Sequence, residues 1–197
     1  EAVELAPAME QTLRNYKLNA KEKGVALELH ASEELPRVRG NWDLLLQVLD
    51  NLVGNGLKFT AAGGSLSLRA YPWPDTCTID PSTASNPENP ACELTAPLPK
   101  LRVEISDTGS GISREDQEKI FDRFYRVENA VHTEVGTGLG LSIVRGILEK
   151  HGAMIRMVSE LNVGTTFWFD LPLEDADETE LRLQAERRNS SNLGDGI

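Results

Sequence analysis

A glycine-rich segment that opens a helix places the strongest limit on what this 197-residue chain can fold into. Residues 136–141 read GTGLGL, and apolar side chains then recur at helical spacing as far as His151. Unpaired backbone N–H groups at a helix start make an anion site, here for the phosphates of a nucleotide. The spacing is not that of a P-loop or of GxGxxG, and no βαβ unit surrounds it, so dinucleotide-binding folds are disfavoured. For this segment alone, a flexible loop is the alternative.

A second segment carries two carboxamides four residues apart. Residues 51–59 read NLVGNGLKF, which puts Asn51 and Asn55 on one helical face with Lys58 three residues further on. An amide oxygen suits Mg²⁺, which takes few protein ligands, and a lysine suits phosphate. The alternative is a buried helix whose Asn side chains satisfy backbone groups at its end.

A third segment, residues 107–112 with the sequence DTGSGI, directly follows a strand. Its glycines let the backbone approach a flat ligand, and the Asp107 carboxylate can accept a hydrogen bond from an exocyclic amine. The alternative is an ordinary strand-to-helix turn, in which Asp and Gly are common.

Hydrophobic periodicity predicts the elements between these segments. We expect a helix capped by Asn41 or Asp43 and stopped at Gly63–Gly64, and a short helix capped by Ser113. The other expected helices cover 6–23 and 139–151, and the expected strands cover 25–30, 65–71, 101–106, 153–159 and 165–171. In the helix over 139–151 the expected inward residues are Ile143, Val144, Ile147 and Leu148. Five strands and three main helices predict an α/β (α+β) two-layer sandwich, a mixed five-stranded sheet with the helices on one face.

Taken together, the order and spacing of these motifs resemble the catalytic domain of sensor histidine kinases. That family belongs to the wider superfamily of gyrase and heat-shock chaperone ATPases, with a Bergerat-type ATP-binding fold. The resemblance covers roughly residues 1–172. The matching segments are NLVGNGLKFT (N box), DTGSGI (first glycine box), IFDRFYRV (F box), GTGLGLSIV (second glycine box) and NVGTTFWF (closing strand).

The resemblance implies a Mg-ATP site with a role for each matching residue. Asn55 would ligate Mg²⁺, with Asn51 and Lys58 near the phosphates, and Asp107 would bind the adenine amino group. Arg126 would reach the γ-phosphate, and Asn51, Lys58 and Arg126 form the expected catalytic set. The other residues expected to line the nucleotide are Phe59, Gly109, Gly111, Ile112, Gly136, Thr137, Gly138, Leu139, Gly140, Leu141 and Thr165. Phe121 and Phe124 would pack the lid over residues 122–135, with plain core packing as the alternative for both.

Family members with a phosphate acceptor carry a histidine followed by an acidic residue, which His30, His132 and His151 do not match. His151 is expected at a helix end, where a cation favours the helix dipole. Hydrolytic relatives place a glutamate base where this chain has Asn51, and an amide cannot accept a proton. We therefore expect ATP to be held without efficient hydrolysis, its γ-phosphoryl passing to a histidine on another domain.

The resemblance also implies a domain organisation and partners. Residues 1–5 would join a missing dimerisation and phosphoacceptor domain, and 6–172 would form the catalytic domain. Composition, in turn, predicts that residues 72–100, rich in Pro, Ser, Thr and Asn, form an insertion and that the charged and polar residues 173–197 form a disordered tail. Cys77 and Cys92 have no metal-like spacing, and we expect inert thiols rather than a redox pair. The expected partners are the phosphoacceptor helices and a response regulator, with ADP as product, a monomeric isolated domain and a homodimeric parent.

The net charge of −11 disfavours nucleic acid as a partner. The expected location of the domain is the cytoplasm, and the parent can still be anchored in a membrane. The alternatives are a degenerate nucleotide-binding scaffold, an anti-sigma-factor-type serine kinase and an ATPase switch. Gly56 stands where alanine is common in the family, a change expected to loosen its helix by up to about 1 kcal/mol.

Overall fold

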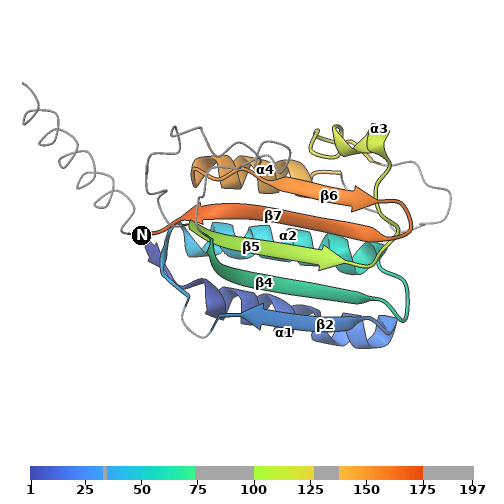
Figure 1. Cartoon of the computed structure of the whole chain (residues 1–197), viewed down its shortest axis with the longest axis horizontal. Coiled ribbons are helices and arrows are strands. Elements are labelled where there is room, and N and C mark those ends of the chain that lie inside the picture. Colours follow the sequence, from blue (N-terminus) through green and yellow to red (C-terminus); the bar gives the residue numbers. More distant parts are fainter. Residues whose placement is uncertain (33–34, 74–99, 127–137, 175–197) are drawn as a thin grey trace, which may run out of the picture.

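A computed structural model describes residues 1–32, 35–73, 100–126 and 138–174. They include a five-stranded sheet in the order β2-β4-β5-β7-β6, in which β2 is parallel to β4 and the other neighbours are antiparallel. The strands are β2 Ala26–Ala31, β4 Ser65–Trp73, β5 Lys100–Asp107, β6 Arg156–Glu160 and β7 Gly164–Pro172. Helices α1 Leu5–Lys23, α2 Trp42–Phe59 and α4 Gly140–Lys150 cover one face (Figure 1). The short helix α3, Arg114–Gln117, lies beside the end of β6. The predicted sandwich is confirmed.

Alternation of side chains along the strands creates the core. On the helix-covered face, β5 contributes Leu101, Val103 and Ile105, and β7 contributes Phe167, Phe169 and Leu171, all buried. Full burial of a side chain such as Phe169, which is 1% exposed, stabilises the fold by about 1.5–3 kcal/mol. The core therefore lies between the sheet and the helices, and it fixes the helix faces that carry the site.

Hydrogen bonds from Lys23 connect the carboxyl end of α1 to the carboxyl end of α2. α1 stops at Gly24, whose φ of 72° suits glycine, and α2 starts at Asn41, whose side chain accepts a hydrogen bond from the N–H of Leu44. The end of α2 differs from the prediction, because the helix stops at Phe59 and not at Gly63–Gly64. Lys23 of α1 donates to the carbonyl oxygens of Leu57 (2.9 Å) and Lys58 (2.6 Å). A cation from another helix thus satisfies the last carbonyl groups of α2.

Two other expectations about the elements need correction. Ile143 was expected to face inward, but it is 38% exposed, whereas Val144, Ile147 and Leu148 are buried. Residues 72, 73 and 100 belong to β4 and β5 and not to the insertion, so only residues 74–99, with both cysteines, lie outside the described residues. Pro72 is tolerated in β4 because β2 ends at Ala31, opposite Ala70, leaving that side of β4 without a partner strand.

The predicted joining strand and tail are both partly built into the fold. β1, Ala2–Val3, pairs with an unpredicted strand β3, Val38–Arg39, and α1 already begins at Leu5. Leu173 forms a bridge with Val38, and the N–H of Glu174 donates to the carbonyl of Arg37. Residues 173–174 therefore belong to the fold, while residues 175–197 lie outside the described part.

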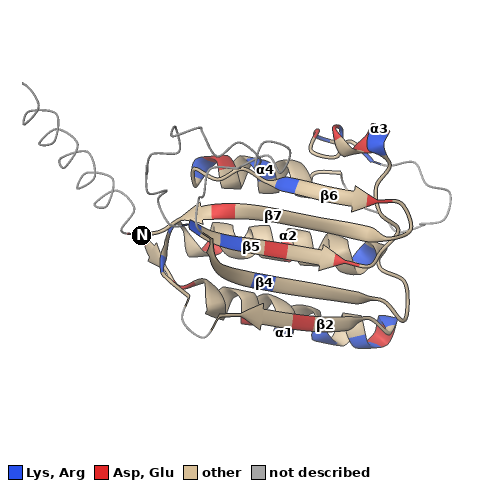
Figure 2. Cartoon of the chain, viewed as in Figure 1, with Lys and Arg blue, Asp and Glu red and all other residues tan. Residues whose placement is uncertain are grey.

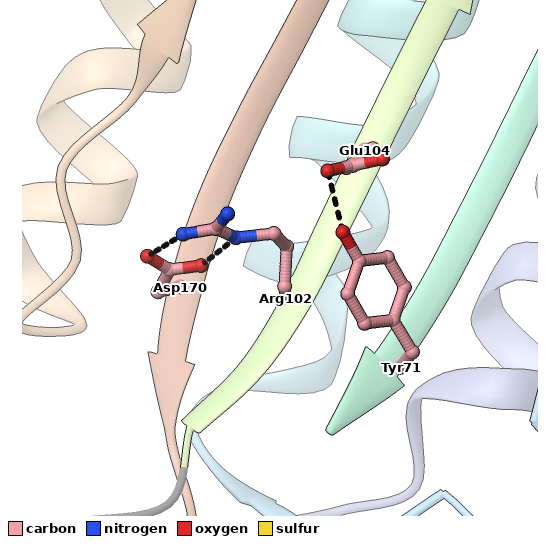
Figure 3. Close-up of polar contacts among 4 residues, drawn as sticks. All are labelled: Tyr71, Arg102, Glu104 and Asp170. Atoms are coloured by element: carbon pink, nitrogen blue, oxygen red, sulfur yellow. Dashed lines mark hydrogen bonds and ion pairs between the residues drawn. The ribbon is translucent and has the colours of Figure 1, made fainter. Parts of the chain in front are cut away.

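No helix of the described residues lies on the other face of the sheet, which carries polar side chains. Charged residues of both signs lie along β5, whereas β4 carries one arginine and β7 one aspartate (Figure 2). Arg102 forms two bonds to Asp170, Nε–Oδ1 at 2.6 Å and Nη2–Oδ2 at 2.9 Å, and its guanidinium lies 3.8 Å from the ring centroid of Trp73. Tyr71 donates to Glu104 at 2.7 Å beside this pair (Figure 3). These contacts pair the charged and phenolic groups on this face with one another. Among the described residues, no helix combines the length and apolarity that crossing a membrane requires.

Candidate functional site

The centre of α2 faces the start of α4. The side-chain NH₂ of Asn51 donates to the carbonyl of Gln47 at 2.8 Å, which leaves its Oδ1 on the side of α4. A Cβ added to Gly140 would lie 2.8 Å from that Oδ1 and 3.8 Å from Nδ2 of Asn55. Both carboxamides therefore lie against the first residue of α4, as the two separate motifs would require for one site.

The amino end of α4 is suited to an anion. Its N-cap residue, Leu139, makes no side-chain capping bond, and its first turn contains no acidic residue. The backbone N–H groups of the first turn have no partner within the helix, and they add to the positive end of its dipole. Leu141 is half-buried and packs on the core. Gly136 and Thr137, two further residues of this motif, lie outside the described residues.

The last turn of α2 holds Lys58 and Phe59. The Lys58 ammonium lies 5.4 Å from the centroid of the Phe59 ring, and Phe59 is 40% exposed. The carbonyl of Phe59 accepts a hydrogen bond from the N–H of Ser110 at 3.2 Å. The end of α2 is therefore bonded directly to the first glycine motif.

Asp107 ends β5 and lies over α2. Its Oδ1 accepts a hydrogen bond from the N–H of Gly109 at 2.8 Å. Burial raises the pKa of the Asp107 carboxyl, while hydrogen bonds from the backbone of Gly109 and Thr165 act in the opposite direction. A Cβ on Gly56 would lie 3.7 Å from Oδ2 of Asp107, so this carboxylate sits one residue along α2 from Asn55.

The glycines of the first motif are required by close backbone contacts. A Cβ on Gly109 would lie 2.6 Å from the Phe59 carbonyl oxygen. Gly111 has a φ of 66°, and a Cβ there would collide with the carbonyl of Glu160 in the β6–β7 turn. Ile112, which follows, donates its N–H to Ser159 Oγ at 2.8 Å. The motif is thus wedged between α2 and β6.

Hydrogen bonds of Phe124 and Tyr125 hold the F box near the carboxyl end of its described part. Tyr125 donates to Asp116 at 2.6 Å, and Ser113 donates to the other oxygen of Asp116 at 2.6 Å. Hydrogen bonds from Ser113 and then Tyr125 lower the pKa of the Asp116 carboxyl. The N–H of Phe124 donates to the carbonyl of Gly138 at 3.0 Å, which bonds the F box to the second glycine motif. The exposed Arg126 follows Phe124 by two residues.

The two phenylalanines of the F box have different environments. Phe121 packs edge-on against Phe167, with ring centroids 6.3 Å apart. Phe124 is 72% exposed and has a φ of 65°, which is unusual for a bulky residue. Core packing therefore describes Phe121 and not Phe124.

His151 does not act as the expected cation at the end of α4. Its Nδ1 lies 2.7 Å from the carbonyl of Ile147, and its Nε2 accepts a hydrogen bond from the N–H of Asn41 at 3.0 Å. An imidazole that donates through Nδ1 and accepts through Nε2 is neutral. His151 therefore links the end of α4 to the cap of α2 by neutral hydrogen bonds. His30 is exposed beside Glu28, and His132 lies outside the described residues.

Ser159 is a site residue that the sequence interpretation missed. Its hydroxyl contacts Ile112 and also Thr165, which is 6% exposed and directly opposite Asp107 in the β5–β7 ladder. The available signal was its position in RMVSE, where residues 157 and 159 share the inward face. Within the described ranges, no group of three or more His, Cys, Asp and Glu side chains is placed to hold a metal ion.

Comparison with known proteins gives a consistent set of similarities. The family model described as "Histidine kinase-, DNA gyrase B-, and HSP90-like ATPase" matches residues 40–175. Drug sensory protein A of Synechocystis sp. is 53% identical over 171 residues, 87% of this chain and 24% of that protein. Sensor histidine kinase WalK of Bacillus subtilis is 37% identical over 139 residues, 70% of this chain and 19% of that protein. The chain thus spans at most 24% of either relative's length.

Solved structures share the same fold. The catalytic domain of histidine kinase ThkA matches with a TM-score of 0.65 and 26% identity, covering 88% of this chain and 95% of that one. Full-length ShkA in complex with AMPPNP matches with a TM-score of 0.65 and 27% identity, covering 88% of this chain and 31% of that one. The mycobacterial sensor histidine kinase MprB, at 22% identity, a TM-score of 0.68 and coverages of 88% and 98%, adds support for the fold alone.

Proposed function

Because the chain belongs to the histidine kinase-, DNA gyrase B- and HSP90-like ATPase family, and contains a histidine kinase ATPase domain, we propose that it binds Mg-ATP for phosphoryl transfer. The acceptor would be a histidine on a phosphoacceptor helical domain, and a response-regulator aspartate would receive the phosphoryl group next. The observation that carries this proposal is the approach of Asn51 and Asn55 to Gly140 at the amino end of α4.

The two ends of the site suit the two ends of ATP. Asp107 would accept a hydrogen bond from the adenine amino group, with Gly109 and Gly111 allowing the base close to the backbone. The α4 amino end, Lys58 and Arg126 would neutralise the phosphates. Transfer would then depend on positioning and on charge neutralisation.

The carboxamides fit a magnesium ion that is held mainly by nucleotide phosphates and water. The bond from Asn51 Nδ2 to Gln47 directs the Asn51 amide oxygen toward Gly140, and Asn55 lies beside it. We assign the metal contact to Asn55 and the place near the phosphates to Asn51. A bound Mg²⁺ would supply further neutralisation of phosphate charge.

Asn51 would also favour phosphoryl transfer to histidine over hydrolysis of ATP. An amide cannot take a proton from water, so the domain would retain ATP until an imidazole arrives. We expect the full 197-residue chain to hydrolyse Mg-ATP slowly and to phosphorylate a phosphoacceptor helical domain supplied in trans. Rapid hydrolysis by the chain alone would contradict this assignment.

Calorimetric titration with ATP and ADP, with and without Mg²⁺, tests the binding site directly. We expect Asp107→Asn to abolish binding and Asn55→Ala to weaken its response to Mg²⁺. The controls are Asp43→Asn and Asn19→Ala, which change exposed residues on α2 and α1. Absence of binding by the unmodified chain would refute the proposal, and binding without transfer would favour a nucleotide-binding scaffold.

A further inference from the structure

Three polar side chains form a row across the end of the sheet. Ser159 on β6 lies directly opposite Thr165 on β7, and Thr165 lies directly opposite Asp107 on β5. Residues opposite one another in an antiparallel ladder project to the same face, which here is the face covered by helices. Thr165 therefore stands between Ser159 and the carboxylate assigned to the adenine amine.

The hydrogen bonds of Ser159 determine the direction of the Thr165 hydroxyl. Ser159 Oγ accepts from the N–H of Ile112 at 2.8 Å and lies 3.0 Å from the carbonyl oxygen of Gly164. That carbonyl can only accept, so it takes the single hydrogen of Ser159. The 2.8 Å contact between Ser159 Oγ and Thr165 Oγ1 then requires the Thr165 hydroxyl to donate.

This network leaves Thr165 with lone pairs and no hydrogen for a ligand. Together with the Asp107 carboxylate, this row of three side chains then offers a ligand only acceptors. A 6-amino purine brings two hydrogens that can meet two acceptors, whereas a 6-oxo purine places a further acceptor against them. Unmatched polar groups in a buried site reduce affinity more than missing apolar contacts do.

We propose that Ser159 is a positioning residue that orients the Thr165 hydroxyl away from the nucleotide and thereby selects a 6-amino over a 6-oxo purine. The inference rests on the proposed function of the same site and extends it. Ser159 acts through Thr165 and through Ile112, which belongs to the first glycine motif.

Strands β5 and β7 contain a matched control. Ser106 and Thr166 form another hydroxyl pair, 2.7 Å apart, on neighbouring strands β5 and β7. Both residues follow the alternation to the opposite face of the sheet, away from Asp107 and Thr165. Ser106→Ala therefore removes a similar hydrogen bond without changing the nucleotide-facing row.

The test compares ADP with inosine diphosphate on the full chain by calorimetric titration. Ser159→Ala releases the Thr165 hydrogen, and we expect the preference for ADP to fall about threefold to tenfold, the value of one hydrogen bond. Ser159→Thr keeps the hydroxyl and should restore the preference, and Ser106→Ala should leave it unchanged. In the Thr165→Val background, Ser159→Ala should have no further effect on the ratio. An unchanged ratio in Ser159→Ala, or additive effects in the double variant, would overturn the proposal.

Hydrogen exchange of the nucleotide-free protein separates this inference from the proposed function. The amide of Ile112 should be protected in the unmodified chain and in Ser159→Thr, and should exchange faster in Ser159→Ala. An unprotected Ile112 amide in the unmodified chain would overturn the network whether or not nucleotides bind. A protected amide without ADP binding would support the network and refute the nucleotide function.

Discussion

At the scale of single residues, Gly56 shows how a local preference is reversed by a tertiary contact. Alanine stabilises a helix interior by about 1 kcal/mol relative to glycine. In α2, however, a Cβ at residue 56 would collide with Cδ1 of the fully buried Leu66 on β4. Because overpacking of a core typically destabilises by about 1–3 kcal/mol, the contact outweighs the helix preference.

We therefore expect Gly56→Ala to lower the free energy of unfolding by up to about 2 kcal/mol, the overpacking loss less the helix gain. Gly146→Ala is the matched control, since a Cβ added to Gly146 of α4 would meet no other segment of the described residues within 4 Å and should gain up to about 1 kcal/mol. Urea unfolding of both variants decides the matter. Combining Gly56→Ala with Leu66→Val should remove most of the loss, and a stabilising Gly56→Ala would disprove the collision.

Asp107 should make nucleotide binding sensitive to pH. Burial raises the pKa of its carboxyl above the ordinary value for aspartate, and only the ionised form presents acceptors to an amine. Affinity should therefore decline as pH falls through this raised pKa, which begins at a higher pH than for an exposed aspartate. Titration with adenosine, which has no phosphate to protonate, isolates the effect. A flat profile above the ordinary aspartate range would contradict the expectation.

At the scale of elements, an ion pair links β5 to β7 on the face of the sheet opposite the helices. Arg102 on β5 and Asp170 on β7 form a two-bonded pair (Figure 3) and are only 13% and 17% exposed. The ring of Trp73, 3.8 Å from the Arg102 guanidinium, adds to their shielding. The hydrogen bond to Asp170 is the largest of the causes that raise the pKa of the Arg102 guanidinium. A shielded charge that loses its partner retains the cost of desolvation.

We expect Asp170→Ala to destabilise the fold by about 2–4 kcal/mol, slightly less than for a fully buried pair. The exposed pair Arg145–Glu149 on α4, at 56% and 60% exposure, provides the control, and Glu149→Ala should change stability by less than about 0.5 kcal/mol. Both values come from urea unfolding. Equal effects of the two substitutions would show that the Arg102–Asp170 pair carries no special weight.

At the scale of the whole molecule, the site belongs to no single element. Its groups come from α2, β5, the start of α4 and β7, and each is held by contacts with another segment. Lys23 of α1 binds the end of α2, and His151 binds the beginning of α2 to the end of α4. A ligand that spans these elements should therefore stabilise the entire fold.

Saturation with nucleotide should raise the midpoint of thermal unfolding. At 100 times Kd, ADP adds about 2.7 kcal/mol, which corresponds to roughly 5–10 °C for a domain of this size. Differential scanning calorimetry at several ADP concentrations measures the shift. Asp107→Asn should abolish it and Asp43→Asn should preserve it, while a shift of equal size in Asp107→Asn would remove Asp107 from the site.

Local sequence pattern was sufficient to predict most of the helices and strands of this protein. Helical and alternating periodicity located α1, α2, α4 and the five main strands, because burial of one face is encoded by nearby residues. The caps at Asn41 and Ser113 were predictable for the same reason, since each bonds to a backbone group three residues away. The order of the motifs, moreover, indicated the family before any contact was known.

What only the tertiary structure decided involves atoms that meet from distant segments. The end of α2 depends on Lys23, the space at Gly56 on Leu66, and the neutral state of His151 on a backbone group 110 residues away. The role of Ser159 likewise depends on Ile112, Gly164 and Thr165 meeting at one hydroxyl group. Sequence periodicity reports which side of an element is buried, but not which atom of another element it meets, and hydrogen-bond direction and steric fit are set by that meeting.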